Sequence, residues 1–375
     1  MEKILFVTSE AHPLIKTGGL GDVSGSLPLA LQKLQRDLRI IMPAYRALRQ
    51  RFSDATLLTT LALPGAEVRI LSTRFPDTDI PLLLVDAPEL FDRAGGPYGA
   101  ADGKDWPDNP QRFASFCRAV VAVALNQAGA DWQPDVVHCN DWQSGLVPAL
   151  LSLQARLPAT VFTIHNLAYQ GLFDADTFTE LQLPEALWHP DGVEFHGRLS
   201  FIKAGLANAD MLSTVSPNYA NEIRSAAFGY GLEGLLSARS DRLMGILNGV
   251  DYRQWDPSSD PLLAANYSPS DLSGKALGKA ALEQEFGLSP EPDTPLIGMV
   301  GRLVPQKGVD LVIDALPRLL KGPARLIVLG SGDIGLELAL QAAANAHPKR
   351  IAVNIGYDEA QAHRIEAGID MFLMP

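Results

Sequence analysis

The sequence has few cysteines and no long apolar run. Two cysteines in 375 residues, Cys117 and Cys139, cannot build a disulfide framework or a four-cysteine metal site. We expect both to be small buried side chains. No apolar run approaches the roughly 20 residues of a membrane span, and the N-terminus lacks the basic, apolar and small-residue regions of a signal peptide. These absences predict a cytoplasmic protein.

Positive charge is also in short supply. The chain has 31 Lys and Arg against 43 Asp and Glu, which gives a net charge of −12 and a pI near 5.0. A protein with this net negative charge repels the phosphates of nucleic acid and an anionic membrane surface, so neither is expected as a partner. An anionic small substrate is still compatible with this charge where local cations such as Lys16 offset it.

What is present indicates two α/β domains. Hydrophobic residues make up 47% and charged residues 20%, as in a soluble protein with sizeable cores. Short apolar runs alternate with helical patterns, which predicts right-handed βαβ units and parallel sheets. Two runs near residues 66–75 and 80–88 resemble paired strands in an insertion. A connector rich in Pro, Ser and Asp spans residues 256–271. We therefore predict domains at 1–242 and 243–375.

Polar clusters follow many of the predicted strands. In an open parallel sheet, ligands bind beyond the carboxyl ends of the strands, where the connecting loops diverge. Each marked cluster falls at such a place, which predicts a ligand-binding cleft. The clusters are "EAHPLIKTGGLGD" (10–22), "HCNDW" (138–142), "HNLAYQG" (165–171), "NGVD" (248–251), "GRLVPQKG" (301–308), "GSGD" (330–333) and "IGYDE" (355–359).

The first cluster carries a cation and glycines into a helix. Gly18 and Gly19 would let the backbone approach a ligand, and the amides entering the helix could hold an anion with help from Lys16. The spacing matches neither G-x-G-x-x-G nor the nucleotide P-loop. The alternative is a tight turn with a solvated lysine.

The second cluster offers a carboxylate at a strand end. Asp141 could orient a hydroxyl or accept a proton, and Trp142 could present a flat face to a sugar ring. The alternative is that Asp141 caps the following helix. His138 is expected to be a core histidine, and the residues alone assign no role to Asn140.

The third cluster places His165 and Asn166 at the end of another strand. A neutral imidazole there could hydrogen-bond a substrate hydroxyl, or the segment could stabilise positive charge through backbone carbonyls; packing is the alternative. No histidine or carboxylate grouping has metal-ligand spacing, so we expect no protein-built metal site.

Two cations precede a helix in the second half of the chain. Arg302 and Lys307 would converge on a helix N-terminus near Val309, which suits a diphosphate leaving group whose charge grows as its bond breaks. A solvated charged loop is the alternative. Gly330 begins a second glycine turn suited to a close approach of phosphate or ribose.

These segments together resemble the bacterial glycogen synthase and plant starch synthase family. The resemblance covers nearly the whole chain. Its members are retaining glucosyltransferases of the GT-B fold, in which two Rossmann-like domains face each other across a cleft. The matching sequence segments are "KTGGLGDV", "LFDRAGGPYG", "DNPQRF", "PDVVHCNDW", "FTIHNLAYQG", "SFIKAGL", "TVSPNYA", "GYGLEGLL", "GILNGVD", "GRLVPQKG" and "DMFLMP".

The resemblance implies transfer of glucose from ADP-glucose to the nonreducing end of an α-1,4-glucan. Retention is expected through a front-face, oxocarbenium-like route without a required metal or other cofactor. Residues with implied catalytic roles are Asp141 near the acceptor hydroxyl, His165 at the donor glucose, and Arg302 and Lys307 at the departing ADP.

The resemblance also implies a set of substrate-binding residues. Lys16, Gly18 and Gly19 would contact the phosphates of ADP-glucose, Asn248 the donor glucose, and Tyr357 the adenine. The set is completed by Tyr98, Asn166 and Gly330.

Two departures from the family are visible. Asn140 stands where members often have histidine. Members also continue after "DMFLMP" into a loop that carries a glutamate, whereas this sequence ends at Pro375. On that basis we expect an incomplete second domain with part of its sheet uncovered, and little or no synthase activity.

Two other functions compete with the synthase. One is an inactive remnant that binds a nucleotide sugar or a glucan. The other is a Rossmann dehydrogenase, which the lack of G-x-G-x-x-G after a strand disfavours. The sequence leaves open the choice between ADP-glucose and UDP-glucose.

Overall fold

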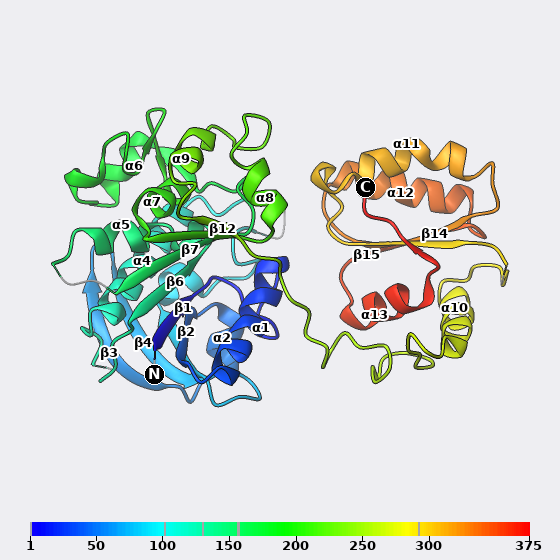
Figure 1. The fold of residues 1–375 in the computed structure, drawn as a ribbon, viewed down its shortest axis with the longest axis horizontal. Coiled ribbons are helices and arrows are strands. Elements are labelled where there is room, and N and C mark those ends of the chain that lie inside the picture. The colour runs from blue at the N-terminus through cyan, green and yellow to red at the C-terminus, as the bar shows by residue number, and fades with distance from the viewer. Residues whose placement is uncertain (1, 101–102, 130, 156–157, 292) are drawn as a thin grey trace. The chain divides into compact units, whose positions relative to one another are not determined.

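The computed structural model describes residues 2–100, 103–129, 131–155, 158–291 and 293–375. The chain forms two compact units, Met1–Gly249 and Val250–Pro375 (Figure 1).

The unit boundary lies after the predicted one. It falls between Gly249 and Val250 rather than between residues 242 and 243. The reason is a short strand, β12 (Leu243–Gly245), which pairs in parallel with β11 (Met211–Thr214) and so extends the first sheet.

The described residues of the first unit form one large sheet and one small one. The large sheet has the order β12-β11-β7-β6-β1-β2-β5-β4-β3. Its other strands are β1 (Lys3–Val7), β2 (Asp37–Pro43), β3 (Thr56–Leu63), β4 (Ala66–Arg74), β5 (Pro81–Asp86), β6 (Val136–Asn140) and β7 (Ala159–Ile164). The small sheet, in the order β8-β10-β9, consists of β8 (Leu172–Asp174), β9 (Glu194–Phe195) and β10 (Arg198–Ser200).

Helices connect the parallel strands of the large sheet, as the alternating pattern predicted. They are α1 (Gly19–Lys33), α2 (Arg46–Arg51), α3 (Pro88–Phe91), α4 (Asn109–Ala124), α5 (Leu146–Ser152), α6 (Ala175–Glu180), α7 (Phe201–Asn208), α8 (Pro217–Glu222) and α9 (Glu233–Ala238). Two short 3₁₀ turns, η1 (Trp142–Ser144) and η2 (Glu185–Leu187), complete the set.

The sheet is parallel from β12 to β5, and then antiparallel through β4 and β3. The predicted pair of strands near residues 66–75 and 80–88 is confirmed as β4 and β5. They continue the main sheet rather than standing apart from it.

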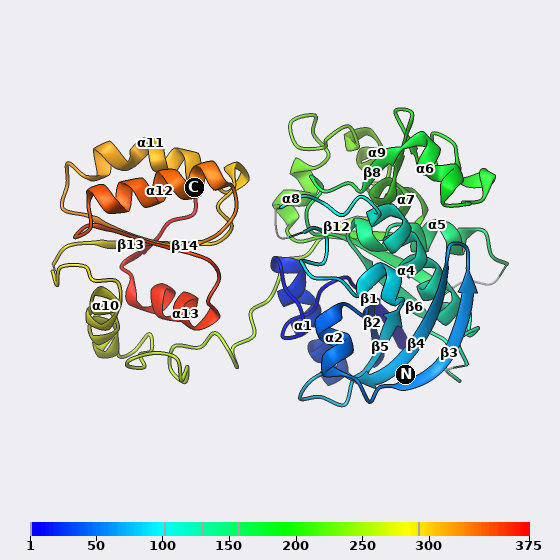
Figure 2. The same ribbon diagram turned by 180° about the vertical axis from the view of Figure 1, so that it is seen from behind.

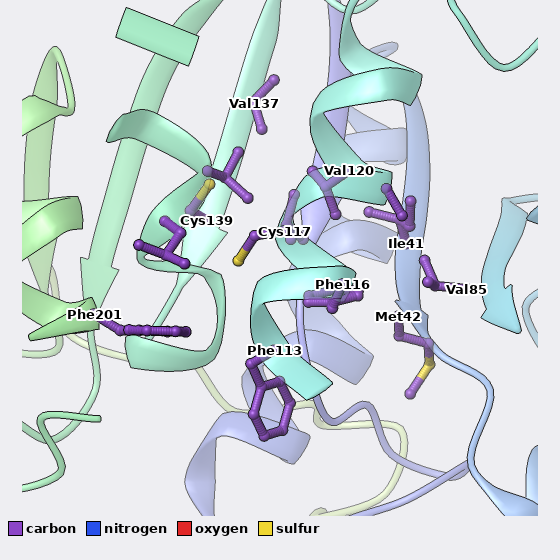
Figure 3. Packing of buried hydrophobic residues seen from close by; sticks show 14 of the residues in the cluster. Ile41, Met42, Val85, Phe113, Phe116, Cys117, Val120, Val137, Cys139 and Phe201 are labelled. Atoms are coloured by element: carbon purple, nitrogen blue, oxygen red, sulfur yellow. The ribbon is translucent and has the colours of Figure 1, made fainter. Parts of the chain in front are cut away.

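Helix α4 lies within the core of the first unit (Figure 3). Phe113, Phe116 and Val120 on this helix are fully buried. Cys117 and Cys139 are also fully buried and are free thiols, so the expectation of small core side chains is confirmed. Burial raises the pKa of the Cys117 thiol to about 12. Neither cysteine is therefore suited to nucleophilic chemistry.

The topology places a switch point between β1 and β6. From β1 the chain builds outward through β2 and β5, and it later returns to the other side of β1 to build β6, β7 and β11. Loops leaving β1 and β6 therefore diverge at the carboxyl edge of the sheet, where ligands of open α/β sheets bind.

The second unit is a smaller α/β layer structure (Figure 2). Its described residues give a parallel sheet in the order β15-β14-β13-β16. The strands are β13 (Leu296–Val300), β14 (Arg325–Gly330), β15 (Ile351–Ile355) and β16 (Met371–Phe372). The helices are α10 (Ser273–Glu285), η3 (Pro305–Lys307), α11 (Val309–Leu319), α12 (Ile334–Ala346) and α13 (Glu359–Gly368).

Helices cover both faces of this sheet. In β14, Leu326 and Val328 point into a core shared with α11 and α12, whereas Ile327 and Leu329 point into a second core with α10 and α13. Figures 1 and 2 show these helix pairs on opposite sides of the sheet. The expectation of a partly uncovered sheet is therefore wrong for the residues that the structure describes, because α10 precedes the first strand and α13 precedes the last.

Candidate functional site

The strand-end clusters of the first unit meet because their strands are neighbours. Strands β1, β6 and β7 lie side by side in parallel register. The polar residues that follow them, from Glu10, Asn140 and His165 onward, therefore share one edge of the sheet. The sequence predicted the individual strand ends, and the topology brings them together.

The glycine segment after β1 presents open backbone at the start of α1. Gly18 is the residue before the helix, and a Cβ atom placed at Gly18 or Gly19 would meet nothing within 4 Å. Lys16 lies beside this opening, with its Nζ 2.8 Å from Oδ1 of Asp22. Both features expected for anion binding, an exposed backbone and a cation, are therefore adjacent. The binding role of Lys16, Gly18 and Gly19 stays a prediction.

A buried carboxylate lies under this segment. Glu10 is 3% exposed and accepts hydrogen bonds from the backbone N–H and the hydroxyl of Thr17. The Tyr98 hydroxyl donates to Glu10 at 2.5 Å and lies 2.7 Å from Ser9 Oγ. Burial raises the pKa of Tyr98 well above its usual value, and the Glu10 charge adds to this. Tyr98, a predicted substrate-binding residue, is thus joined to the strand-end cluster.

Sequence reasoning did not single out Glu10. Its position directly after a buried strand, in the first of the polar clusters, was the available signal. A buried carboxylate needs hydrogen-bond donors, and Thr17 and Tyr98 supply them from two distant parts of the sequence.

Asp141 has an unusual backbone conformation. Its φ of 56° and ψ of 179° lie in a region that residues with a Cβ rarely adopt, at a cost of about 1–3 kcal/mol. The backbone N–H of Asp141 donates to the carbonyl oxygen of Thr163 at 3.0 Å, which ties it to β7. This strain at a strand end is typical of functional positions.

The Asp141 carboxylate accepts hydrogen bonds from the residues that follow the neighbouring strand β7, not from the helix that follows Asp141 itself. Oδ1 accepts hydrogen bonds from the backbone N–H of His165 at 2.7 Å and of Asn166 at 3.4 Å. The alternative that Asp141 caps the helix is therefore wrong, because its side chain makes no capping bond to η1. Burial raises the pKa of Asp141, while His165 and the two backbone N–H groups act in the opposite direction.

His165 and Asn166 lie half-buried at the end of β7. The His165 ring places Nε2 3.0 Å from Oδ1 of Asn140. Asn166 Oδ1 accepts from the backbone N–H of Ala168 at 3.1 Å and shapes the loop. Asn140, Asp141, His165 and Asn166 therefore form one hydrogen-bonded cluster.

His138 is a packing residue, as predicted. Its Nε2 is 2.7 Å from Thr163 Oγ1, and its ring lies edge-on to Phe6. Burial lowers the pKa of His138 to about 4, with a further contribution from the nearby His165. The imidazole is therefore neutral at physiological pH.

Trp142 does not offer a face to a sugar. It packs edge-on against Phe113 with ring centroids 4.9 Å apart, and also contacts Phe173 and Phe201. A Cβ atom at Gly171 would lie 2.3 Å from the Trp142 ring. The hypothesis of a stacking platform is wrong, because the ring fills the space under the strand ends.

Glycine contacts hold the strand-end loops of the second unit together. A Cβ atom at Gly330 would lie 1.9 Å from the carbonyl oxygen of Gly301. Leu303 bridges to Gly332, and its N–H donates to Ser331 O at 2.9 Å. The N–H of Gly356 donates to Gly330 O at 3.0 Å. Gly330 therefore has a packing role in joining three loops, beside its predicted role in binding.

The two predicted cations lie on the first of these loops. Arg302 is half-buried just after β13, and Lys307 is exposed at the end of η3. Gly308, in the left-handed conformation with φ of 68°, turns the chain into α11 at Val309. The predicted placement of Lys307 just before a helix N-terminus is confirmed.

The remaining predicted residues lie outside these clusters. Tyr357 follows β15 in the second unit and is 62% exposed. Asn248 is exposed, near the end of the first unit. Their binding roles stay predictions.

Within the described parts of the chain, no group of three or more His, Cys, Asp or Glu side chains is arranged to hold a metal ion. No helix built from those residues has the length and apolar character needed to cross a bilayer.

Two protein families match the chain. The family described as "Starch synthase catalytic domain" matches residues 3–238, and the family "Glycosyl transferases group 1" matches residues 282–374. The two matches fall in the two structural units, and they make the chain a glycosyltransferase.

Named relatives match over the full chain. The chain is 55% identical to a glycogen synthase of Thioalkalivibrio sulfidiphilus and 53% identical to one of Cellvibrio japonicus. In each case the alignment covers 100% of this chain and 78% of the relative.

The fold is similar to that of a solved starch synthase. The catalytic domain of starch synthase IV from Arabidopsis thaliana, bound to ADP and acarbose, matches with a TM-score of 0.87 and 30% identity. The match covers 100% of this chain and 78% of that one. The predicted GT-B fold class, built from Rossmann-like units, is thereby confirmed.

Proposed function

The chain belongs to the glycogen synthase and starch synthase family, and on that premise we propose that it is a glycogen synthase that uses ADP-glucose. It would transfer glucose to the nonreducing end of an α-1,4-glucan with retention and release ADP. The observation that carries this proposal is the likeness, over the whole of this chain and 78% of the other, to a starch synthase solved with ADP and acarbose. The same likeness favours a synthase over an inactive binding remnant.

The first unit supplies groups suited to the acceptor and the sugar. Asp141 holds its carboxylate at a strand end in a strained, preorganised conformation. We assign it to the acceptor hydroxyl, which a carboxylate can orient as a hydrogen-bond acceptor. His165, fixed beside it, is assigned to the transferred glucose. Lys16 and the open backbone at Gly18 and Gly19 are assigned to the phosphates.

The second unit supplies groups suited to the leaving ADP. Negative charge on the diphosphate increases as the glycosidic bond breaks, so cations placed there stabilise the transition state more than the ground state. Arg302 and Lys307 lie on a loop whose course is set by the glycine contacts described above. Tyr357 and Asn248 are assigned to adenine and donor glucose.

No metal or other cofactor is part of this proposal. The leaving-group charge is assigned to side chains, so chelation is expected to leave the rate unchanged. A cytoplasmic location likewise stays a prediction.

The test measures ADP release and glucan elongation by the purified chain. ADP-glucose or UDP-glucose would be supplied with glycogen, with and without a metal chelator, and the anomeric configuration of the new linkage read by NMR. The sequence led us to expect little or no activity, partly because the second sheet was predicted to be uncovered. Since helices cover both faces of that sheet, we now expect α-1,4 elongation with ADP-glucose and little with UDP-glucose. Binding of ADP-glucose without turnover would support the remnant instead.

A further inference from the structure

One buried amide joins three strand ends in the first unit. Asn140 is fully buried at the end of β6. Its Nδ2 donates to the backbone carbonyl oxygen of Val7, at the end of β1, at 3.0 Å. Its Oδ1 lies 3.0 Å from Nε2 of His165, which follows β7. The side chain of Asn140 therefore spans from one neighbouring strand to the other.

The partners of the amide fix which way it points. A backbone carbonyl oxygen can only accept a hydrogen bond, so the atom that faces Val7 O must be the NH₂ group. A second carbonyl oxygen, that of His138, lies 3.5 Å from the same nitrogen. The amide oxygen is then left to face His165, and an amide oxygen can only accept.

This orientation dictates the protonation of the histidine ring. Nε2 of His165 must carry a proton in order to donate to Asn140 Oδ1. We propose that Asn140 is a positioning residue that holds His165 in the neutral tautomer protonated at Nε2, with Nδ1 as a hydrogen-bond acceptor. Among the described residues, none makes a hydrogen bond to that Nδ1 atom.

The charged and titratable neighbours do not replace Asn140 in this role. The Asp141 carboxylate accepts a hydrogen bond from the backbone N–H of His165 and not from a ring nitrogen. From the other strands, His138 bonds to Thr163 and Glu10 bonds to Thr17 and Tyr98. Tyr219 on α8 accepts from the backbone N–H of Leu167. The ring contact of His165 thus goes to the neutral amide of Asn140.

The consequence for the substrate rests on the proposed function. An unprotonated Nδ1 accepts a hydrogen bond from a hydroxyl group and has no proton to give to a carbonyl or ether oxygen. The ring is therefore suited to a sugar hydroxyl. Loss of the tautomer is expected to weaken recognition of that hydroxyl more than it disturbs the fold.

The tautomer is read directly by NMR of the full chain labelled with ¹⁵N-histidine, without substrate. Spectra at neutral pH would be compared for the wild type and for His165→Gln, which identifies the signal. We expect two-bond and three-bond couplings typical of a protonated Nε2 and a bare Nδ1. A protonated Nδ1, or an even mixture of tautomers, in the wild type would overturn the proposal.

Two variants separate positioning from packing. Asn140→Leu removes the acceptor and should shift the tautomer ratio by about fivefold, as expected from one net hydrogen bond. Asn140→Asp keeps an oxygen for Nε2, so it should keep the tautomer, although it loses the donor to Val7 O. Asn208→Leu, outside the strand-end cluster, is the control and should change neither.

A tautomer that stays the same in Asn140→Leu would refute the role. If that variant does not fold, the tautomer in Asn140→Asp decides, and a protonated Nδ1 there refutes it. None of these NMR measurements needs turnover. The positioning role of Asn140 can therefore be refuted while synthase activity is confirmed, and synthase activity can be refuted while the positioning role is confirmed.

Discussion

Gly330 and Gly301 lie in such close contact that no side chain fits between them. A Cβ atom added to Gly330 would be 1.9 Å from the carbonyl oxygen of Gly301. This contact joins the ends of β13 and β14, where the loops that carry Arg302 and Ser331 begin. The arrangement of the proposed donor-binding loops thus depends on the absence of a side chain at Gly330.

Replacing Gly330 by alanine should therefore damage both stability and activity. We expect a loss of about 1–3 kcal/mol from overpacking, since the contacted atom is backbone and cannot rotate away. Thermal unfolding would measure this loss. Gly322→Ala is the control, because a Cβ there would meet its nearest neighbour at 3.6 Å. Equal melting temperatures for the two variants would show that the loop gives way easily.

Lys307→Ala should lower kcat by about 10²–10³, as expected for loss of one group that stabilises developing charge. The expected KM for ADP-glucose changes much less. Lys321→Ala, an exposed lysine in the same unit, is the control. Steady-state kinetics would measure both constants. An unchanged kcat with a raised KM would show that Lys307 binds the ground state and the transition state equally well.

Lys16→Gln should weaken ADP-glucose binding without unfolding the protein. An ion pair that Lys16 forms with the half-exposed Asp22 is of a kind worth about 0–1 kcal/mol. Calorimetric titration and a melting curve would be measured together. Lys33→Gln, at the other end of α1, serves as control. Normal affinity with a collapsed melting temperature would make Lys16 structural.

Asp141→Asn should stabilise the protein at neutral pH and abolish most activity. Burial raises the folded-state pKa of Asp141 above its unfolded value. Its contribution to stability is therefore full at pH values below the unfolded pKa and is lost as the pH rises through the folded pKa. Asparagine keeps an oxygen for the His165 N–H and carries no charge.

The melting temperatures of this variant and the wild type should therefore differ at pH 7 and converge in acid. A variant that is less stable than the wild type at every pH would contradict the assigned cost of the buried charge. Asp174→Asn, an exposed residue at the end of β8, is the matched control.

Glu283→Gln should destabilise the second unit by about 3–5 kcal/mol, the usual effect of leaving a buried charge without its partner. Glu283 is 2.6 Å from Arg325, and both side chains are at most 3% exposed. Glu285→Gln breaks a more exposed pair with Arg364 and should cost about 0–1 kcal/mol. Denaturant unfolding compares the two, and similar losses would show that Arg325 is satisfied by backbone carbonyls alone.

The sequence predicted the fold class because the hydrophobic periods are local. The strands, the paired strands β4 and β5, and the helix beginning at Val309 all follow from short-range patterns. The unit boundary was misplaced because β12 is only three residues long and is defined by its pairing with β11. Pairing between distant segments is not visible in a local pattern.

The same limit applies to the site. Asp141 and His165 were predicted as site residues because each follows a strand, whereas Glu10 was not predicted and Trp142 was predicted to stack on a sugar but packs in the core. Both depend on neighbours far away in the sequence: Tyr98 for Glu10, and Phe113 and Phe201 for Trp142. The hydrogen bond between Asn140 and His165 likewise required the strand order.

The position of β1 between β2 and β6 has a consequence for synthesis on the ribosome. Strand β1 is made before both of its partners, and one of these, β6, begins at Val136. A nascent chain can pair β1 with β2 early, whereas the β1–β6 pairing must close a loop of more than a hundred residues. The edge that carries Glu10, Asn140 and His165 therefore cannot assemble until β7, which directly precedes His165, has also emerged. Ligand binding by ribosome-bound intermediates should begin only after that point.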